Sequence, residues 1–191
     1  MLTHENLVAN LKQFEGMKDF DGFGEHDVVM AALPFFHIYG LVVIMKATLA
    51  QGGTLVTMPR FDFVEFLGLV QKYHATLLPI VPPIVLALVK QPAVAQFDLS
   101  SVRMAFSGAA PLGEDIAREL SRKLGCPVVQ GYGMTEASPV THLSRHATRR
   151  SSRARSARWS PTPRCASSTS SPAKTSAHVR KASCSSEDRR S

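Results

Sequence analysis

Hydrophobic residues in the first 144 positions gather in short unbroken runs, and these runs alternate with stretches of helical periodicity. Continuous rather than alternating hydrophobicity is typical of strands that are buried on both faces. The runs predict five strands, near residues 28–32, 54–58, 76–81, 103–107 and 128–131. Helices are predicted between them, at residues 3–14, 39–50, 63–73 and 114–124 and from Pro82 onward, where proline suits the first helical turn.

Buried strands that alternate with helices predict an α/β fold, with a mostly parallel sheet covered by helices. In such sheets, ligands bind at the loops beyond the carboxyl ends of the strands. Three of these loops join small residues to polar or aromatic ones: LPFFHIYG at 33–40, SGAAPLG at 107–113 and QGYGMTE at 130–136. We expect the three loops to meet in one cleft at the same edge of the sheet.

Charge divides the chain near residue 144. The net charge of +7 comes from the tail, because residues 1–144 hold 10 Lys and Arg against 13 Asp and Glu, whereas residues 145–191 hold 12 against 2. The tail is rich in Arg and Ser and has no Leu, Ile, Phe, Met or Gly. Such a composition cannot offset the ordering entropy of about 1–2 kcal/mol per residue, so we predict that 145–191 is disordered.

Several protein classes are disfavoured by composition. No apolar run reaches the roughly 18–20 residues of a membrane span. The first residues, MLTHEN, lack the basic and apolar regions of a signal peptide, so we expect a cytoplasmic protein. The three cysteines lie far apart without metal-site spacing, which argues against a disulfide framework or a structural zinc site.

Each of the three loops also has a purely structural interpretation. His37 beside two phenylalanines suits a packed, hydrogen-bonded histidine. The segment SGAAPLG suits a strand-to-helix turn with proline at the helix start, and QGYGMTE suits a tight turn with an exposed aromatic ring. The order and spacing of the three loops along the chain favour a functional interpretation over these separate ones.

A family resemblance rests on the motifs LTHENLVANL, LPFFHIYG, MPRFD, VPPIV, DLSSVRMAFSGAAPLG and QGYGMTEASPV, which together cover nearly all of residues 2–144. In these motifs the chain resembles the adenylate-forming, or AMP-binding, superfamily, and within it the acyl-CoA synthetases and 4-coumarate–CoA ligases. The resemblance implies the N-terminal domain of that fold and the ATP-dependent activation of a fatty or aryl acid to acyl-AMP, followed by transfer to CoA. The implied cofactors and co-substrates are ATP, Mg²⁺ and CoA, with no specific nucleic-acid partner.

The resemblance also implies residue roles. Tyr132 would stack on adenine, Thr135 would contact phosphate oxygens, and Glu136 would hold Mg²⁺, a cation that prefers oxygen ligands. The expected catalytic residues are Thr135, Glu136 and His37. The expected nucleotide-binding residues are Ser107, Gly108, Ala109, Ala110, Gln130, Gly131, Tyr132, Gly133, Met134 and Thr135. The expected acyl pocket comprises His37, Tyr39, Met104, Gly131, Pro139 and Val140.

This sequence departs from the family pattern in two ways. Phe106 stands where plant ligases of the 4-coumarate branch tend to have a polar or basic residue, which argues against a plain hydroxycinnamate substrate. The family's phosphate loop precedes the segment that reads LTHEN, and its ribose-binding aspartate and catalytic lysine follow GYGMTE. None of these is found in this sequence. We therefore expect a central piece of the adenylation domain that is inactive by itself.

The tail has a further interpretation. Codons can be chosen for residues 151–191 so that a reading frame shifted by one base gives family-like motifs, including PGSVG and GELLIRGP. We therefore expect the tail to be out of frame. Two alternatives remain open: a non-catalytic fragment that binds a nucleotide or an acyl group, and a basic tail that binds nucleic acid.

Overall fold

The structure of the protein is a computed structural model that describes residues 1–16 and 23–144. Its centre is a sheet with the strand order β2-β1-β3-β4-β5-β6. The strands are β1 (Val28–Ala31), β2 (Thr54–Thr57), β3 (Leu77–Ile80), β4 (Met104–Ser107), β5 (Val128–Gly133) and β6 (Val140–Leu143). Strands β1 to β5 pair in parallel, which confirms the predicted fold class, and β6 pairs antiparallel to β5.

All five predicted strands are present, and β6 is an additional one. The sequence of β6, Val140–Leu143, is VTHL, and none of its four residues is fully buried. Hydrophobicity therefore does not mark it as a strand. It forms because a short turn after β5 brings the chain back alongside that strand, where the backbone groups can pair.

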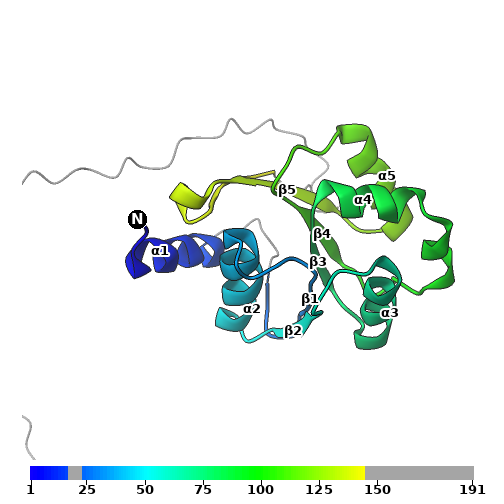
Figure 1. Cartoon of the computed structure of the whole chain (residues 1–191), viewed down its shortest axis with the longest axis horizontal. Helices are drawn as coiled ribbons and strands as arrows, with labels where there is room; N and C mark the ends of the chain where they lie inside the picture. Colours follow the sequence, from blue (N-terminus) through cyan, green and yellow to red (C-terminus); the bar gives the residue numbers. More distant parts are fainter. Residues whose placement is uncertain (17–22, 145–191) are drawn as a thin grey trace, which may run out of the picture. The chain divides into compact units, whose positions relative to one another are not determined.

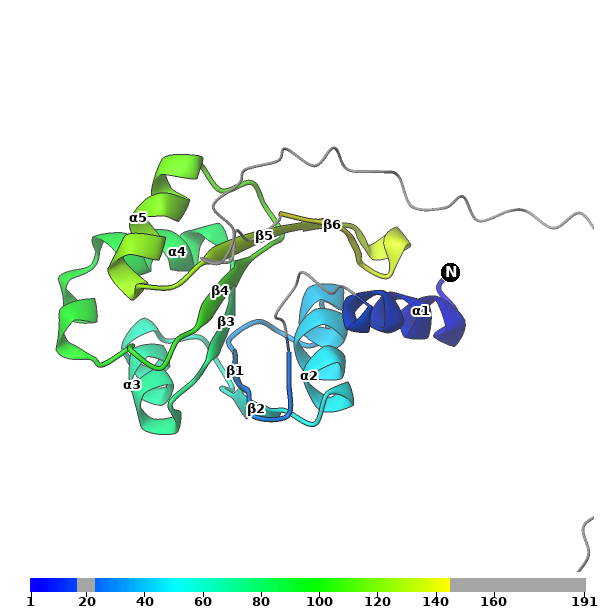
Figure 2. The same ribbon diagram turned by 180° about the vertical axis from the view of Figure 1, so that it is seen from behind.

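Helices cover both faces of the sheet, as Figures 1 and 2 show from opposite sides. Those on one side are α3 (Phe63–Tyr73), α4 (Pro82–Lys90) and α5 (Glu114–Leu124), and those on the other are α1 (His4–Glu15), η1 (Tyr39–Lys46) and α2 (Ala47–Ala50). Two short 3₁₀ turns complete the set, η2 (Pro92–Gln96) and η3 (Thr135–Ala137). The helix predicted over 39–50 is correct in position, but its first eight residues form a π-helix and only the last four an α-helix.

The alternation of side chains along each strand divides the core into two layers. Met30, Leu78 and Ala105 point toward α3, α4 and α5, where they join a cluster that includes Phe66 and Leu120. The intervening strand residues point the other way and pack with the start of η1 in a second cluster, which contains Val29, Tyr39, Val43, Ile44, Leu77, Met104, Phe106 and Val129. This second layer borders the candidate site described below.

An ion pair between Asp27 and Arg103, with the hydrogen bonds around it, connects the amino ends of three strands and is termed the clasp below. The Asp27 carboxylate, just before β1, accepts hydrogen bonds from Arg103 Nε at 2.7 Å and Nη2 at 2.6 Å, from the Thr76 hydroxyl at 2.7 Å and from the Gly24 N–H at 2.8 Å. Burial raises the pKa of Asp27, but these hydrogen bonds and the charge of Arg103 outweigh it and hold the pKa below its usual value. The clasp lies at the amino ends of the strands, whereas the three loops lie at the carboxyl ends.

The described residues all belong to one compact unit, Met1–Ser152. The predicted disorder and the shifted reading frame of residues 145–191 lie outside the described residues, so the predicted boundary at residue 144 stays a prediction. Within the described ranges, the longest helix has 12 residues, and none is long and apolar enough to cross a membrane.

Candidate functional site

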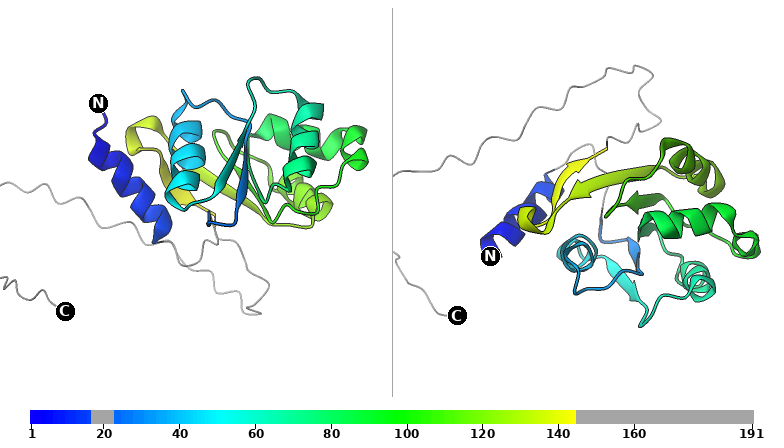
Figure 3. Two further views of the ribbon diagram at one scale, coloured as in Figure 1. Left: turned by 90° about the horizontal axis from the view of Figure 1, so that it is seen from below. Right: turned by 45° about the horizontal axis from the view of Figure 1, so that its top comes forward.

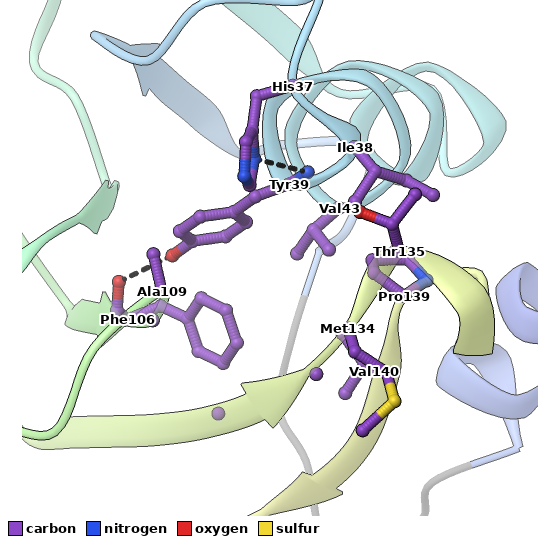
Figure 4. Close-up of a pocket in the computed structure, with 13 residues that line it drawn as sticks. His37, Ile38, Tyr39, Val43, Phe106, Ala109, Met134, Thr135, Pro139 and Val140 are labelled. Atoms are coloured by element: carbon purple, nitrogen blue, oxygen red, sulfur yellow. Dashed lines mark hydrogen bonds between the residues drawn. The ribbon is translucent and has the colours of Figure 1, made fainter.

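The three loops singled out in the sequence lie at the carboxyl ends of β1, β4 and β5, which run in the same direction. The third of them, 130–136, begins within β5, because this strand extends to Gly133. The carboxyl ends of the three strands therefore share one edge of the sheet, and residues of all three loops enclose a pocket of about 140 Å³ (Figure 4). Its lining consists of His37, Ile38, Tyr39, Val43, Phe106, Gly108, Ala109, Gly131, Gly133, Met134, Thr135, Pro139 and Val140.

Tyr39 forms the inner wall of the pocket together with Phe106. The two rings meet edge to face, with centroids 5.8 Å apart and planes inclined by 68°. The Tyr39 hydroxyl donates a hydrogen bond to the backbone oxygen of Phe106 at 2.9 Å and lies 3.5 Å from that of Ile80. Burial raises the pKa of Tyr39 well above its usual value, so the hydroxyl stays neutral and links η1 to the carboxyl ends of β3 and β4.

The turn before η1 brings Tyr39 and His37 to the pocket. A Cβ on Gly40 would lie 2.2 Å from the backbone oxygen of Pro34, so this close approach requires glycine. His37 is exposed, and its Nδ1 accepts a hydrogen bond from the Tyr39 N–H at 3.2 Å. A neutral His37 therefore carries its proton on Nε2, the nitrogen left to meet a ligand at the pocket.

Two glycines allow the aromatic rings to lie against bare backbone. A Cβ on Gly131 would lie 2.7 Å from Cζ of Phe106, and one on Gly108 would lie 3.1 Å from the Tyr39 ring. A side chain at Gly131 would therefore push Phe106 into the pocket. The pocket is narrow and its wall is apolar because the aromatic rings pack directly against the glycine backbone.

The turn between β5 and β6 carries Thr135 and Glu136. The Met134 N–H donates to the Pro139 oxygen at 2.9 Å, and the Ser138 N–H donates to the Thr135 oxygen at 3.2 Å. This closed turn brings Thr135 to the mouth of the pocket and leaves Glu136 exposed. Figure 4 shows Thr135 and Pro139 opposite Tyr39 across the pocket.

The structure brings ten of the predicted residues into this pocket. They are His37, Tyr39, Gly108, Ala109, Gly131, Gly133, Met134, Thr135, Pro139 and Val140. Six others do not line it, namely Met104, Ser107, Ala110, Gln130, Tyr132 and Glu136. The functional roles of both groups stay predictions, since no ligand is present.

Strand alternation explains several of these placements. Met104 lies on the same face of β4 as Phe106 but two residues deeper, in the core, whereas Ser107 points to the opposite face. Gly131 faces Phe106, so Tyr132 points away from the pocket, where its ring lies 5.9 Å from that of His142. Tyr132 is 59% exposed, which leaves ring surface free for stacking.

Three lining residues were not predicted as pocket residues: Ile38, Val43 and Phe106. For Phe106 a signal existed, because it shares its strand face with Met104 and lies nearer the carboxyl end. Position along the strand therefore favoured Phe106 over Met104. For Val43 a signal also existed, because it follows Tyr39 by four residues and this spacing places both side chains on one face of a helix.

The charges around the pocket limit what it can hold. None of its lining residues is Lys or Arg. The described residues contain no group of three or more His, Cys, Asp or Glu side chains that could hold a metal ion. A Mg²⁺ ion, however, is often held by one carboxylate together with phosphate oxygens of a bound nucleotide, and the exposed Glu136 at the turn fits that requirement.

The SGAAPLG loop has unusual local features. Ala109 adopts a left-handed backbone with φ of 69°, a conformation that L-residues rarely occupy. The Ser107 hydroxyl is buried and has no hydrogen-bond partner among the described residues. Strained and unsatisfied groups of this kind concentrate at functional sites, which agrees with a role for this loop in ligand binding.

Comparisons with known proteins extend these observations. Residues 1–170 match the family described as AMP-binding enzyme. A 4-coumarate–CoA ligase of Oryza sativa subsp. japonica is 48% identical over 145 residues, which cover 75% of this chain and 26% of that protein. A 4-coumarate–CoA ligase of Narcissus pseudonarcissus is 45% identical over 145 residues. The chain thus spans about a quarter of the length of these curated relatives.

Solved structures give the same result. ATP-bound MatB from Rhodopseudomonas palustris is 34% identical and superposes with a TM-score of 0.68, covering 78% of this chain and 28% of that one. The N-terminal domain of FACL13 from Mycobacterium tuberculosis is 27% identical, with a TM-score of 0.66, over 74% of this chain and 35% of that one.

Proposed function

Because the chain belongs to the family of AMP-binding enzymes, we propose that it carries the acid-binding and adenine-binding part of an acid–thiol ligase. The proposed reaction is the ATP-dependent conversion of a carboxylic acid to acyl-AMP, followed by transfer of the acyl group to CoA. The main support from the structure is the meeting of the three loops in one apolar pocket that borders the exposed turn of Thr135 and Glu136.

In this proposal the acid lies against Tyr39 and Phe106, with its carboxylate toward His37 and Thr135. The lining contains no Asp, Glu, Lys or Arg side chain, and the Tyr39 hydroxyl is already engaged with the backbone oxygen of Phe106. An apolar wall suits an apolar acid, so we propose a fatty or aryl acid as the substrate. A hydroxyl on the buried end of an aryl acid would find no charged partner in this lining.

The nucleotide would occupy the outer side of β5. The exposed ring of Tyr132 would stack on adenine, and the backbone of residues 107–110 would line the adenine edge. Backbone groups of residues 130–134 would complete this site. Thr135 would contact phosphate oxygens, and Glu136 would hold Mg²⁺ together with them. Magnesium would supply charge neutralisation for the leaving pyrophosphate.

We also propose that the chain alone does not complete adenylation. Stabilising the charge that develops on a triphosphate needs cationic groups in position, and losing one such group costs about 10²–10³ in rate. No Lys or Arg lines the described pocket. Binding of an acyl-adenylate analogue is therefore expected without measurable turnover.

The test uses the full chain and a non-hydrolysable acyl sulfamoyl adenosine, titrated by calorimetry with fatty and aryl acyl groups. We expect saturable binding that Tyr132→Ala weakens about tenfold, since stacking on an aromatic ring contributes roughly 1–3 kcal/mol per base. Tyr73→Ala is the matched control, because Tyr73 is an exposed aromatic remote from the pocket lining. Equal losses for the two variants, or no binding, would refute the proposed site.

Acid-dependent exchange of pyrophosphate into ATP tests the catalytic part. We expect no exchange by the chain alone. Exchange at the rate of an intact ligase of the family would show that the described pocket already contains the essential groups.

A further inference from the structure

Helix α1 contacts the pocket wall through one buried side chain. Asn10 is only 4% exposed, and its Nδ2 donates a hydrogen bond to the backbone oxygen of Val140 at 2.9 Å. Its Oδ1 lies 3.4 Å from the Val140 N–H, which donates to it. The amide thus meets both backbone groups of Val140 as a neighbouring strand would, across 130 residues of sequence. Figure 3 shows α1 beside the β5–β6 hairpin.

Val140 links this contact to the proposed acyl pocket. Its backbone bonds to Asn10, whereas its side chain lines the pocket opposite Tyr39 and Phe106. The preceding residue, Pro139, also lines the pocket, and its backbone oxygen accepts from the Met134 N–H. A shift of Val140 would therefore first move the part of the pocket wall that Val140 and Pro139 form.

Val140 begins the strand β6, which pairs with β5 on one side. The register between β5 and β6 is irregular at Tyr132 and Gly133, so the ladder itself holds this end of β6 loosely. Without the Asn10 amide, the part-buried carbonyl of Val140 would lose this hydrogen bond, and a polar group that is shielded from water without a partner is unfavourable. Asn10 thus supports the end of the strand that the ladder secures least.

We propose that Asn10 is a positioning residue for the acyl pocket: it holds Val140, and through Val140 the wall that faces Tyr39 and Phe106. The proposal rests on the function proposed above. It predicts that loss of the Asn10 amide weakens binding of the acyl group but not of the nucleoside, because the Asn10 amide bonds Gln13 on its own helix and Val140 on the acyl side of the pocket.

The test compares two ligands in the full chain, an acyl sulfamoyl adenosine and the same sulfamoyl adenosine without its acyl group. Asn10→Ala is expected to weaken the acylated ligand about tenfold and to leave the other within twofold. Asn10→Asp keeps the size of the side chain but removes the donor to Val140, so the same selective loss is expected. Asn6→Ala is the control, because Asn6 lies on the same helix and its amide, among the residues that the structure describes, bonds Thr3 and not the pocket wall.

Equal weakening of both ligands by the Asn10 variants would overturn the proposal, as it would indicate general loss of structure. Unchanged affinity for the acylated ligand would also overturn it. Failure of the wild-type chain to bind either ligand would refute the proposed function instead. In that case amide hydrogen exchange tests the contact alone: Asn10→Ala, which removes both the donor and the acceptor, should raise exchange at Val140 and Met134 at least fivefold while β3 and β4 keep their protection, and unchanged exchange would overturn the proposal.

Discussion

Removal of the Asp27 carboxylate should destabilise the fold by a predictable amount. The side chain of Asp27 is 9% exposed and that of Arg103 is 33% exposed, so the pair is largely buried on the carboxylate side. Breaking a buried pair by deleting one partner costs about 3–5 kcal/mol, and Asp27→Ala also removes the acceptor of the hydrogen bonds from Thr76 and Gly24. Water can reach part of Arg103, so for Asp27→Ala we expect a loss near the lower end, about 3 kcal/mol.

The loss should be visible in chemical and thermal unfolding. Urea titrations followed by far-ultraviolet circular dichroism give the free energy of unfolding, and a loss of about 3 kcal/mol corresponds to a fall in Tm on the order of 10 °C. Glu25→Ala is the control, because Glu25 is a neighbouring carboxylate whose side chain is 75% exposed. The control should stay within about 0.5 kcal/mol of the wild type.

The effect should also depend on pH in a defined direction. The pKa of Asp27 is lowered in the folded state, so its contribution is complete at pH values above the unfolded pKa of about 3.9 and is lost as the pH falls through the folded pKa. The difference between wild type and Asp27→Ala should therefore be constant from about pH 5 to 7 and shrink below about pH 4. A difference under about 0.5 kcal/mol near neutral pH, or one that grows on acidification, would refute the clasp.

Four further outcomes are expected. Gly40→Ala should prevent the turn before η1 and destabilise the chain by more than about 2 kcal/mol in urea titrations, because the new Cβ would meet the Pro34 oxygen. Gly131→Ala should push Phe106 into the pocket and weaken binding of long acyl sulfamoyl adenosines in calorimetry, with short ones affected less. In an intact ligase that carries this segment, Glu136→Ala should reduce pyrophosphate exchange, and added Mg²⁺ should restore part of it; an unchanged rate would remove Glu136 from the metal role. Burial raises the pKa of Cys126 to about 11, so iodoacetamide at about pH 8 should leave Cys126 unmodified in the folded chain and label it in urea, as read by peptide mass spectrometry.

Several features of the site could be predicted because they depend on the hydrophobic pattern and on small residues within short segments of the sequence. Apolar runs located β1 to β5, and their common direction implied that 33–40, 107–113 and 130–136 would share one edge of the sheet. The small residues in these loops indicated close backbone approach. The structure bears this out at Gly108 and Gly131, where no side chain would fit without a shift of its neighbour.

Other features depend on partners that are distant in the sequence. The ring of Tyr39 packs against Phe106, near the carboxyl end of β4, and the two rings line the pocket together. Met104 lies two residues earlier on the same strand and is therefore a core residue. The strand β6 exists because the turn after β5 returns the chain alongside that strand, although β6 has polar residues at two of its four positions and none that is fully buried.

The sequence by itself determined the positions of β1 to β5 and of the helices between them, because periodicity and turn residues act over a few neighbouring positions. Only the tertiary structure decided that Asn10 would hold Val140 and that the Tyr39 hydroxyl would bind the Phe106 oxygen, 130 and 67 residues away. Both are hydrogen bonds of buried groups. A buried polar group must find a hydrogen-bond partner, and its partner is a backbone atom that the packing of the helices on the sheet brings close to it. This proximity depends on the tertiary structure and is not encoded in any local sequence pattern.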